Sequence, residues 1–160
     1  MSEKILHLVI RFSDGLFDIG DVIGKHNEVV DKYGYVWFGK IGTTLSSTRI
    51  DALNEQVKKG IPTFIYLVKG NRKKSTAYRA KLLFASKELP KGEAKKIPSY
   101  YSGNNLRQYM KAWIKTGEIS EVDMSSMKNL KAINSIYPIQ ETLVRSSSGY
   151  FLVHESNDIF

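Results

Sequence analysis

The chain of 160 residues contains no cysteine and only four prolines. The absence of cysteine excludes disulfide frameworks, thiolate nucleophiles and zinc sites with sulfur ligands. Its apolar runs stay far below the roughly 20 residues of a membrane-spanning helix, so we expect no membrane contact. The N-terminus does not resemble a signal peptide, so we expect a cytoplasmic protein. The length and the 42% hydrophobic content predict a single globular domain over residues 1–160. The last residues show no clear domain end, which suggests the N-terminal module of a longer protein.

Acidic residues are scarce in the middle of the chain. Residues 58–115 contain fifteen Lys or Arg and only two acidic residues, whereas residues 1–57 contain six basic and eight acidic residues. Residues 116–160 contain three basic and six acidic residues, and the whole chain carries a net charge of +8. A strongly basic centre between two mildly acidic ends predicts a polyanionic partner.

Candidate catalytic groups are also few. The three histidines lack the spacing of a sequence-local metal site. The triplet Glu93-Ala94-Lys95 resembles the Glu-x-Lys of metal-dependent nucleases, but no aspartate occurs between Asp51 and Asp123. We therefore predict a binding protein that has no catalytic residue, no bound metal and no cofactor.

Hydrophobic periodicity predicts short elements of both kinds. Residues 5–12 are an apolar, branched run typical of a strand, and helical spacing from Asp18 or Asp21 to about Tyr33 predicts a helix that Gly34 ends. Later predictions are a strand at 35–41, a helix from Ser46, Ser47 or Thr48 to Lys59, strands at 63–69 and 77–86, a strand from about Lys111, two short helices within 125–146 and a strand at 150–154. This order predicts an α+β fold, a small curved mixed β-barrel flanked by helices.

Aromatic residues are interleaved with the basic residues. Trp37 and Phe38 share a short strand, and further aromatic residues occur at Tyr66, Tyr78, Tyr100, Tyr101, Tyr109 and Trp113. Lys and Arg bind phosphates, whereas a flat ring stacks on an exposed base. Packing in the core is an equally common use of any one such ring. Together the two residue types favour recognition of single bases over a plain duplex backbone.

Four segments carry a resemblance to a known family. The strand ending in Leu8-Val9-Ile10-Arg11-Phe12-Ser13, the Val36-Trp37-Phe38-Gly39 strand, and the strands at 64–68 and 78–82 resemble the PUA-like superfamily, with closer similarity to its EVE and YTH branches. The resemblance implies a small curved barrel that binds nucleic acid, in many members by taking a modified base into an aromatic pocket. EVE-like modules also occur at the N-terminus of modification-dependent restriction proteins.

The resemblance assigns site residues by position. It implies that Trp37 is a wall of the pocket, Ser13 a polar contact at its mouth and Trp113 a second wall, and we add Phe38, Tyr100 and Tyr101 as pocket candidates. The predicted phosphate-binding residues are Lys69, Arg72, Lys73, Lys74, Arg79, Lys81, Lys95 and Lys96. This hypothesis requires the ring of Trp37 to face an open hollow beside a positively charged rim.

The sequence thus predicts a non-catalytic module that recognises a modified, flipped base, such as a methylated one. Its expected partner is nucleic acid, DNA in preference to RNA. The module would serve as the specificity domain of a modification-dependent restriction system, fused to or partnered with a nuclease or NTPase. Two alternatives stay open: an enzyme acting on nucleic acid, and a protein-interaction domain with an acidic partner.

Overall fold

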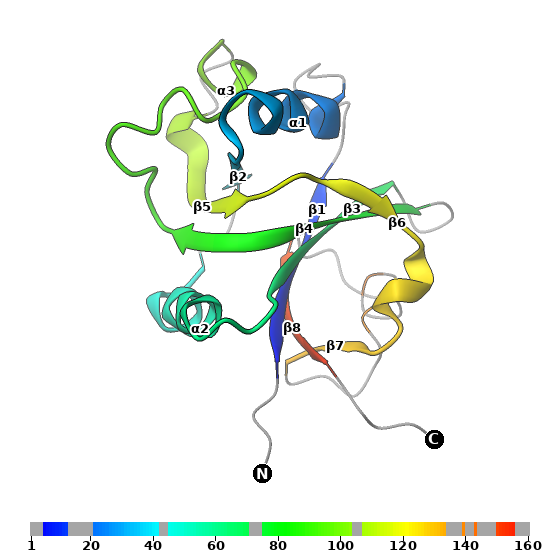
Figure 1. Cartoon of the computed structure of the whole chain (residues 1–160). Helices are drawn as coiled ribbons and strands as arrows, with labels where there is room; N and C mark the ends of the chain where they lie inside the picture. The colour runs from blue at the N-terminus through cyan, green and yellow to red at the C-terminus, as the bar shows by residue number, and fades with distance from the viewer. Residues whose placement is uncertain are drawn as a thin grey trace.

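The computed structural model describes residues 5–12, 21–41, 45–70, 75–103, 107–133, 139, 143 and 150–155. In chain order the described elements are β1 Leu6–Phe12, α1 Val22–Tyr33, β2 Val36–Ile41, α2 Ser47–Lys58, β3 Phe64–Gly70, β4 Ser75–Ser86, α3 Tyr100–Gly103, η2 Arg107–Tyr109, β5 Met110–Thr116, β6 Ser120–Val122, η3 Met124–Met127, β7 Leu130–Ala132 and β8 Tyr150–Glu155. Figure 1 shows α1 and α3 together at one end of the molecule and α2 apart from them, beside β4. The structure has the α+β class that the sequence predicts.

The strands form one curved, mixed sheet. Its order is β2-β5-β4-β3-β1-β8-β7, with β6 paired to β4 outside this path. β1 and β3 are parallel, and the other pairs are antiparallel. The long strand β4 changes partner along its length, because residues 77–79 pair with β6 and residues 82–86 pair with β5. Within the described residues β2 and β7 stay at the two ends of this order, so the sheet is open and the predicted closed barrel is not confirmed.

Local signals set both ends of α1 and the start of α2. The Asp21 side chain accepts a hydrogen bond from the Gly24 amide at 2.9 Å and caps α1. Gly34, with a φ of 88°, ends α1 in the left-handed conformation that glycine adopts without strain. The Ser46 side chain caps α2 by accepting from the Arg49 amide. These signals agree with the two predicted helices. None of the described helices is long and apolar enough to cross a membrane.

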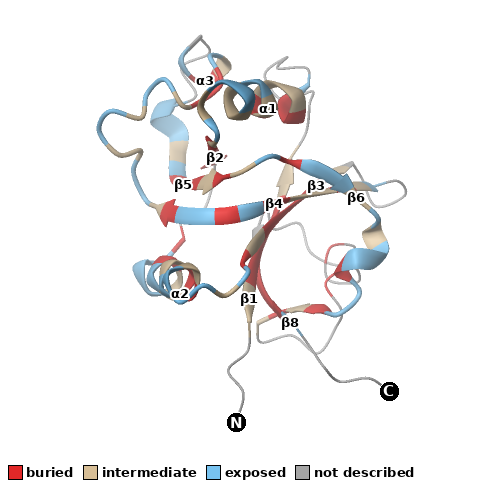
Figure 2. Cartoon of the chain, in the orientation of Figure 1, coloured by how far each residue is buried: buried red, intermediate tan, exposed pale blue. Residues whose placement is uncertain are grey.

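Side chains of β1 alternate between two cores. Leu8 and Ile10 belong to the larger core, which packs against α1 and α2. Val9 points to the opposite face and joins a second core with Met127 and Leu130. Because both faces of β1 are covered, the strand reads as a continuous apolar run in the sequence. Figure 2 shows buried residues along β1, β3 and β8 at the centre of the molecule.

The segment after β6 differs from its prediction. The sequence predicts two short helices within residues 125–146, but η3 is a single short turn and residues 130–132 form β7, which pairs with β8. A strand of three residues is too short to show alternation, so its pairing with a distant strand decides the structure. The remainder of that predicted helical region lies almost entirely outside the described residues.

Candidate functional site

The outer edge of β2 is covered by the segment between β4 and α3. β2 is an end strand, so the amides on its outer side have no strand partner. The Trp37 amide donates to the Lys96 carbonyl oxygen at 2.9 Å, and the Gly39 amide donates to Tyr101 Oη at 2.9 Å. We call residues 89–101 the covering segment. It satisfies this edge of the sheet with one backbone and one side-chain acceptor.

A buried chain of hydrogen bonds fixes Tyr101 in place. His26 Nδ1 lies 2.8 Å from the Val22 carbonyl oxygen, which can only accept, so Nδ1 carries the proton. His26 Nε2 therefore accepts from the Tyr101 hydroxyl at 3.0 Å. Burial lowers the pKa of His26 from 6.5 to about 4, which keeps the ring neutral. Burial also raises the pKa of Tyr101 well above 10, so the phenol keeps its proton.

Gly39 gives Tyr101 the space that it occupies. A Cβ atom at Gly39 would lie 2.7 Å from Met110 Sδ and 2.9 Å from Tyr101 Cε1. Both distances are shorter than ordinary van der Waals contacts, so a side chain at position 39 would push these residues outward.

We predict that Gly39→Ala destabilises the fold by about 1–3 kcal/mol, because the new methyl group overpacks the site. The Met110 side chain can move aside, but the Tyr101 ring is held by its hydrogen bonds. Urea denaturation measures the loss. Gly117→Ala is the matched control, since a Cβ there meets nothing within 4 Å. Equal stability of Gly39→Ala and wild type would show that Tyr101 is not held against β2.

The aromatic cluster beneath the covering segment is closed. Trp37, Ile97, Tyr101 and Trp113 form one buried group, and Trp37 is only 2% exposed. The Tyr101 ring lies 5.1 Å from Trp113 and 4.4 Å from Tyr100, measured between ring centroids. The structure thus brings together four of the predicted pocket residues, but in a packed core rather than around an open hollow.

Burial corrects the geometry expected for three pocket residues. Trp37 and Trp113 are only 2% and 3% exposed, so neither has an open ring face, and Phe38 stacks on His26 at 4.6 Å within the main core. The open wall expected at Trp37 is therefore absent from this structure. The assignment of these rings to a base pocket stays a prediction, and Ser13 lies outside the described residues.

Glu93 holds the covering segment against β2. Its carboxylate accepts from the Tyr35 hydroxyl at 2.9 and 3.0 Å, and the Trp37 indole Nε1 lies 3.4 Å from Oε1. Lys96 Nζ lies 3.6 Å from the same carboxylate. Burial works to raise the pKa of Glu93, but these donors and the charges of Lys96 and Lys115 outweigh it and lower the pKa. Glu93 is therefore ionised, and its carboxylate links the covering segment to Tyr35 and Trp37.

The Glu93-Ala94-Lys95 triplet has no catalytic geometry in this structure. Glu93 is engaged by its tyrosine and tryptophan donors, and Lys95 is exposed. Among the residues that the structure describes, no three His, Asp or Glu side chains gather in a group able to hold a metal ion.

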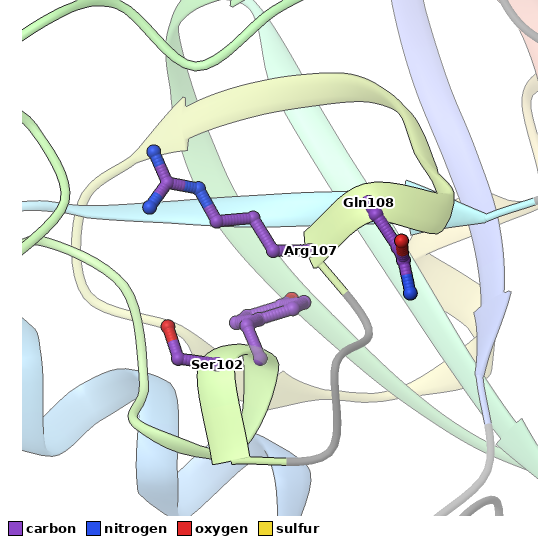
Figure 3. A pocket seen from close by; sticks show the side chains of 4 residues that line it. Ser102, Arg107 and Gln108 are labelled. Carbon is purple, nitrogen blue, oxygen red and sulfur yellow. The ribbon is translucent and has the colours of Figure 1, made fainter.

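An open hollow lies beside the aromatic cluster, between α3 and η2. It has a volume of about 520 Å³ and is lined by Tyr101, Ser102, Arg107 and Gln108. Tyr101 forms its closed inner end, whereas the other three residues are exposed. Figure 3 shows Arg107 and Gln108 projecting in opposite directions from η2, and Ser102 on α3. Tyr109, which follows Gln108 at the end of η2, is 54% exposed, so its flat ring is accessible to solvent.

The predicted phosphate-binding residues that the structure describes lie on several elements. Lys95 and Lys96 lie on the covering segment near α3, and Lys81 is exposed on β4. Lys69 pairs with Thr76 near the start of β4, about 17 Å along the strand from Lys81. Arg79 stacks on Phe64, with its guanidinium carbon 4.6 Å from the ring centroid. Three further predicted residues, Arg72, Lys73 and Lys74, lie outside the described residues.

The sequence pattern marks Tyr101 but not the other three residues that line the hollow. Arg107, Gln108 and Ser102 sit in a segment without clear periodicity, and no motif marks them. Their one sequence signal is position, because Arg107 and the aromatic Tyr109 lie within the strongly basic stretch.

The structure thus combines a mixed curved sheet, an edge strand covered by an aromatic segment and an open hollow beside that segment, lined in part by Arg107. The chain belongs to the Pua-like family, whose family pattern matches residues 8–151. This match confirms the predicted superfamily, whose domains are typically binding modules and in general bind nucleic acid. Searches of curated proteins and of solved structures find no match.

Proposed function

We propose that this protein is a non-catalytic nucleic-acid-binding module that takes an exposed base at the hollow between α3 and η2. Three finer features belong to the proposed function. The base carries a modification such as methylation, the nucleic acid is DNA rather than RNA, and the module gives specificity to a modification-dependent restriction system. The observation that carries the proposal is the 520 Å³ hollow with an exposed guanidinium, on a fold of the Pua-like family.

The hollow offers the contacts that a single base needs. Its volume falls within the range of about 300–1,000 Å³ typical of small-ligand sites. Arg107 can stack its guanidinium plane on a base or bind a phosphate, and Gln108 and Ser102 can hydrogen-bond to a base edge. The exposed ring of Tyr109, which follows Gln108 in η2, would supply a stacking surface.

The surrounding charge favours the approach of a polyanion. Lys91 and Lys95 are exposed around the covering segment, and Lys111 is exposed at the start of β5. Binding to these cations would release counterions, so affinity would fall steeply as salt rises. A base already unstacked, in a single strand or a distorted duplex, would enter with less energetic cost. A methyl group buried in the hollow would add about 0.8 kcal/mol.

A deeper pocket would need the covering segment to move. Trp37 can contact a base only after the Glu93 carboxylate leaves its indole and Ile97 and Tyr101 separate from it. The hollow at Arg107 is therefore the first contact in the proposed mechanism, and Trp37 would follow only in an opened form.

The test is a binding panel that measures fluorescence anisotropy. Short DNA and RNA single strands and duplexes, with and without methylated cytosine or adenine, are titrated at two salt concentrations. We expect tighter binding of single-stranded or distorted DNA and a preference for one modified base. The absence of binding to every ligand at low salt would contradict the proposal.

Arg107→Ala should weaken binding roughly tenfold, since one charged contact to a base contributes about 1–3 kcal/mol. Lys128→Ala is the matched control, because it removes one exposed cation at the C-terminal end of η3, which follows β6, whereas the hollow lies beside α3, away from β6 (Figure 1). If Arg107→Ala loses the preference for one base while the slope of log affinity against log salt concentration is unchanged, Arg107 contacts the base. If the magnitude of that slope falls by about one, Arg107 contacts a phosphate. Equal effects of the two substitutions would show that only general charge matters and would remove the hollow from the site.

A further inference from the structure

We propose that the groove between α2 and β4 is a docking site for a partner protein, which inserts apolar side chains flanked by lysine or arginine. This groove is lined by Asp51, Asn54, Glu55, Val57, Lys58, Leu83 and Phe84 and has a volume of about 480 Å³. It is separate from the hollow at Arg107, shares no lining residue with it and goes beyond nucleic-acid binding.

A β-bulge exposes the apolar side chains of this groove. Regular alternation along β4 buries Leu82 and would also bury Phe84. The register against β5 shifts between these two residues, which turns both Leu83 and Phe84 outward. Leu83 is 37% exposed and Phe84 is 44% exposed. Among the described residues Tyr109 is the only other large apolar side chain with comparable exposure, so the exposed apolar surface is concentrated here.

The groove is rigid because α2 is fastened to β4. The Asn54 side chain donates to the Ala85 carbonyl oxygen at 2.8 Å and accepts from the Ala85 amide at 2.7 Å. These two bonds imitate a strand partner and fix the floor of the groove. Phe84 also rests edge-on against Trp37, with 6.3 Å between ring centroids. A partner would therefore meet a preformed surface with little ordering cost.

The charge of the rim selects the partner. Asp51 and Glu55 lie one helical turn apart on α2, and neither forms an ion pair within the described part of the chain. The groove is lined by these two carboxylates and by one cation, Lys58, so its lining has an acidic excess although the whole protein carries a net charge of +8. An acidic rim repels nucleic acid and attracts cations on a partner protein. The net charge of the chain also opposes pairing of two copies.

The probe is a short fluorescein-labelled peptide in which leucine and phenylalanine alternate with lysine. Two matched peptides replace lysine by glutamate, or leucine and phenylalanine by serine. Anisotropy measures affinity, and amide chemical shifts of the labelled protein locate the site. We expect only the apolar, basic peptide to bind, with shifts confined to α2 and to residues 82–86.

The double variant Asp51→Lys with Glu55→Lys should bind the basic peptide roughly tenfold or more weakly, and it should bind the acidic peptide more tightly. Glu118→Lys with Glu121→Lys is the matched control, because it makes the same charge change at exposed positions near β6. Phe84→Ser and Leu83→Ser should each weaken binding roughly tenfold. Leu83→Ser keeps the test valid should the loss of the Phe84 contact with Trp37 disturb the fold.

Three results would overturn the proposal. The first is peptide binding that is unaffected by Leu83→Ser and by the double charge reversal. The second is a dimer in sedimentation that Leu83→Ser dissociates, which would make a second copy the occupant. The third is a DNA or RNA strand that shifts the amides of α2 and residues 82–86, which would make nucleic acid the occupant.

Discussion

Acidification from pH 6.5 to pH 4 should remove about 3 kcal/mol of folding stability through His26 alone. In the folded chain this histidine is fully buried and its pKa is lowered from 6.5 to about 4. The unfolded chain takes up the proton below pH 6.5, whereas the folded chain does so only near pH 4. Between these values the unfolded state binds more protons. The stabilisation is therefore complete above pH 6.5 and is lost as the pH falls.

Urea denaturation at several pH values across this window measures the effect. His26→Gln should lower the free energy of unfolding at every pH, because it disturbs the contacts with Val22 and Tyr101. It should also make the free energy of unfolding depend less steeply on pH. His7→Gln separates a second contribution, since burial also lowers the pKa of His7. A His26→Gln protein with the same slope as wild type would show that His26 is not held neutral in the core.

Tyr101→Ala should cost about 3–5 kcal/mol, the range for removal of a large buried ring. Tyr101 is 1% exposed and packs between Tyr100 and Trp113. Tyr101→Phe keeps the ring but leaves the Gly39 amide and His26 Nε2 without their partner, which should cost about 1–3 kcal/mol. Thermal or urea unfolding measures both losses.

Tyr109→Phe is the matched control for the hydroxyl deletion. Tyr109 is 54% exposed, so the loss of its hydroxyl should change stability by less than about 0.5 kcal/mol. If Tyr101→Phe is as stable as Tyr109→Phe, the hydroxyl of Tyr101 does not close the edge of β2. The nucleic-acid affinity of Tyr101→Phe should stay near wild type, because the aromatic inner end of the hollow remains.

Local rules were sufficient for most elements of the fold. The Asp21 cap and the left-handed Gly34 fix both ends of α1, the Ser46 cap fixes the start of α2, and each depends on residues a few positions apart. The pairing of β7 with β8 could not be predicted in this way, because a three-residue strand has no measurable period. The family resemblance, carried by short strand motifs, agrees with the Pua-like match over residues 8–151.

The candidate site was harder to predict because long-range contacts decide which rings are open. The sequence places Trp37 on a strand, but its burial depends on Glu93 and Lys96, more than fifty positions later in the chain. The Leu82/Phe84 bulge likewise depends on the register against β5. The alternation of apolar and polar residues predicts which side chains of β4 share a face, but it cannot predict where the register against β5 changes. The basic character of the central stretch, in contrast, needs no structure to be seen.

The hydrogen bonds at the outer edge of β2 make two amide protons natural reporters of opening. The Trp37 and Gly39 amides bond to Lys96 and Tyr101 of the covering segment, whereas the inner side of β2 faces β5. Solvent deuterons reach these two protons as soon as the segment lifts, before the sheet itself separates. Isotope exchange at positions 37 and 39 therefore records the free energy of local opening in the unmodified protein, separately from global unfolding.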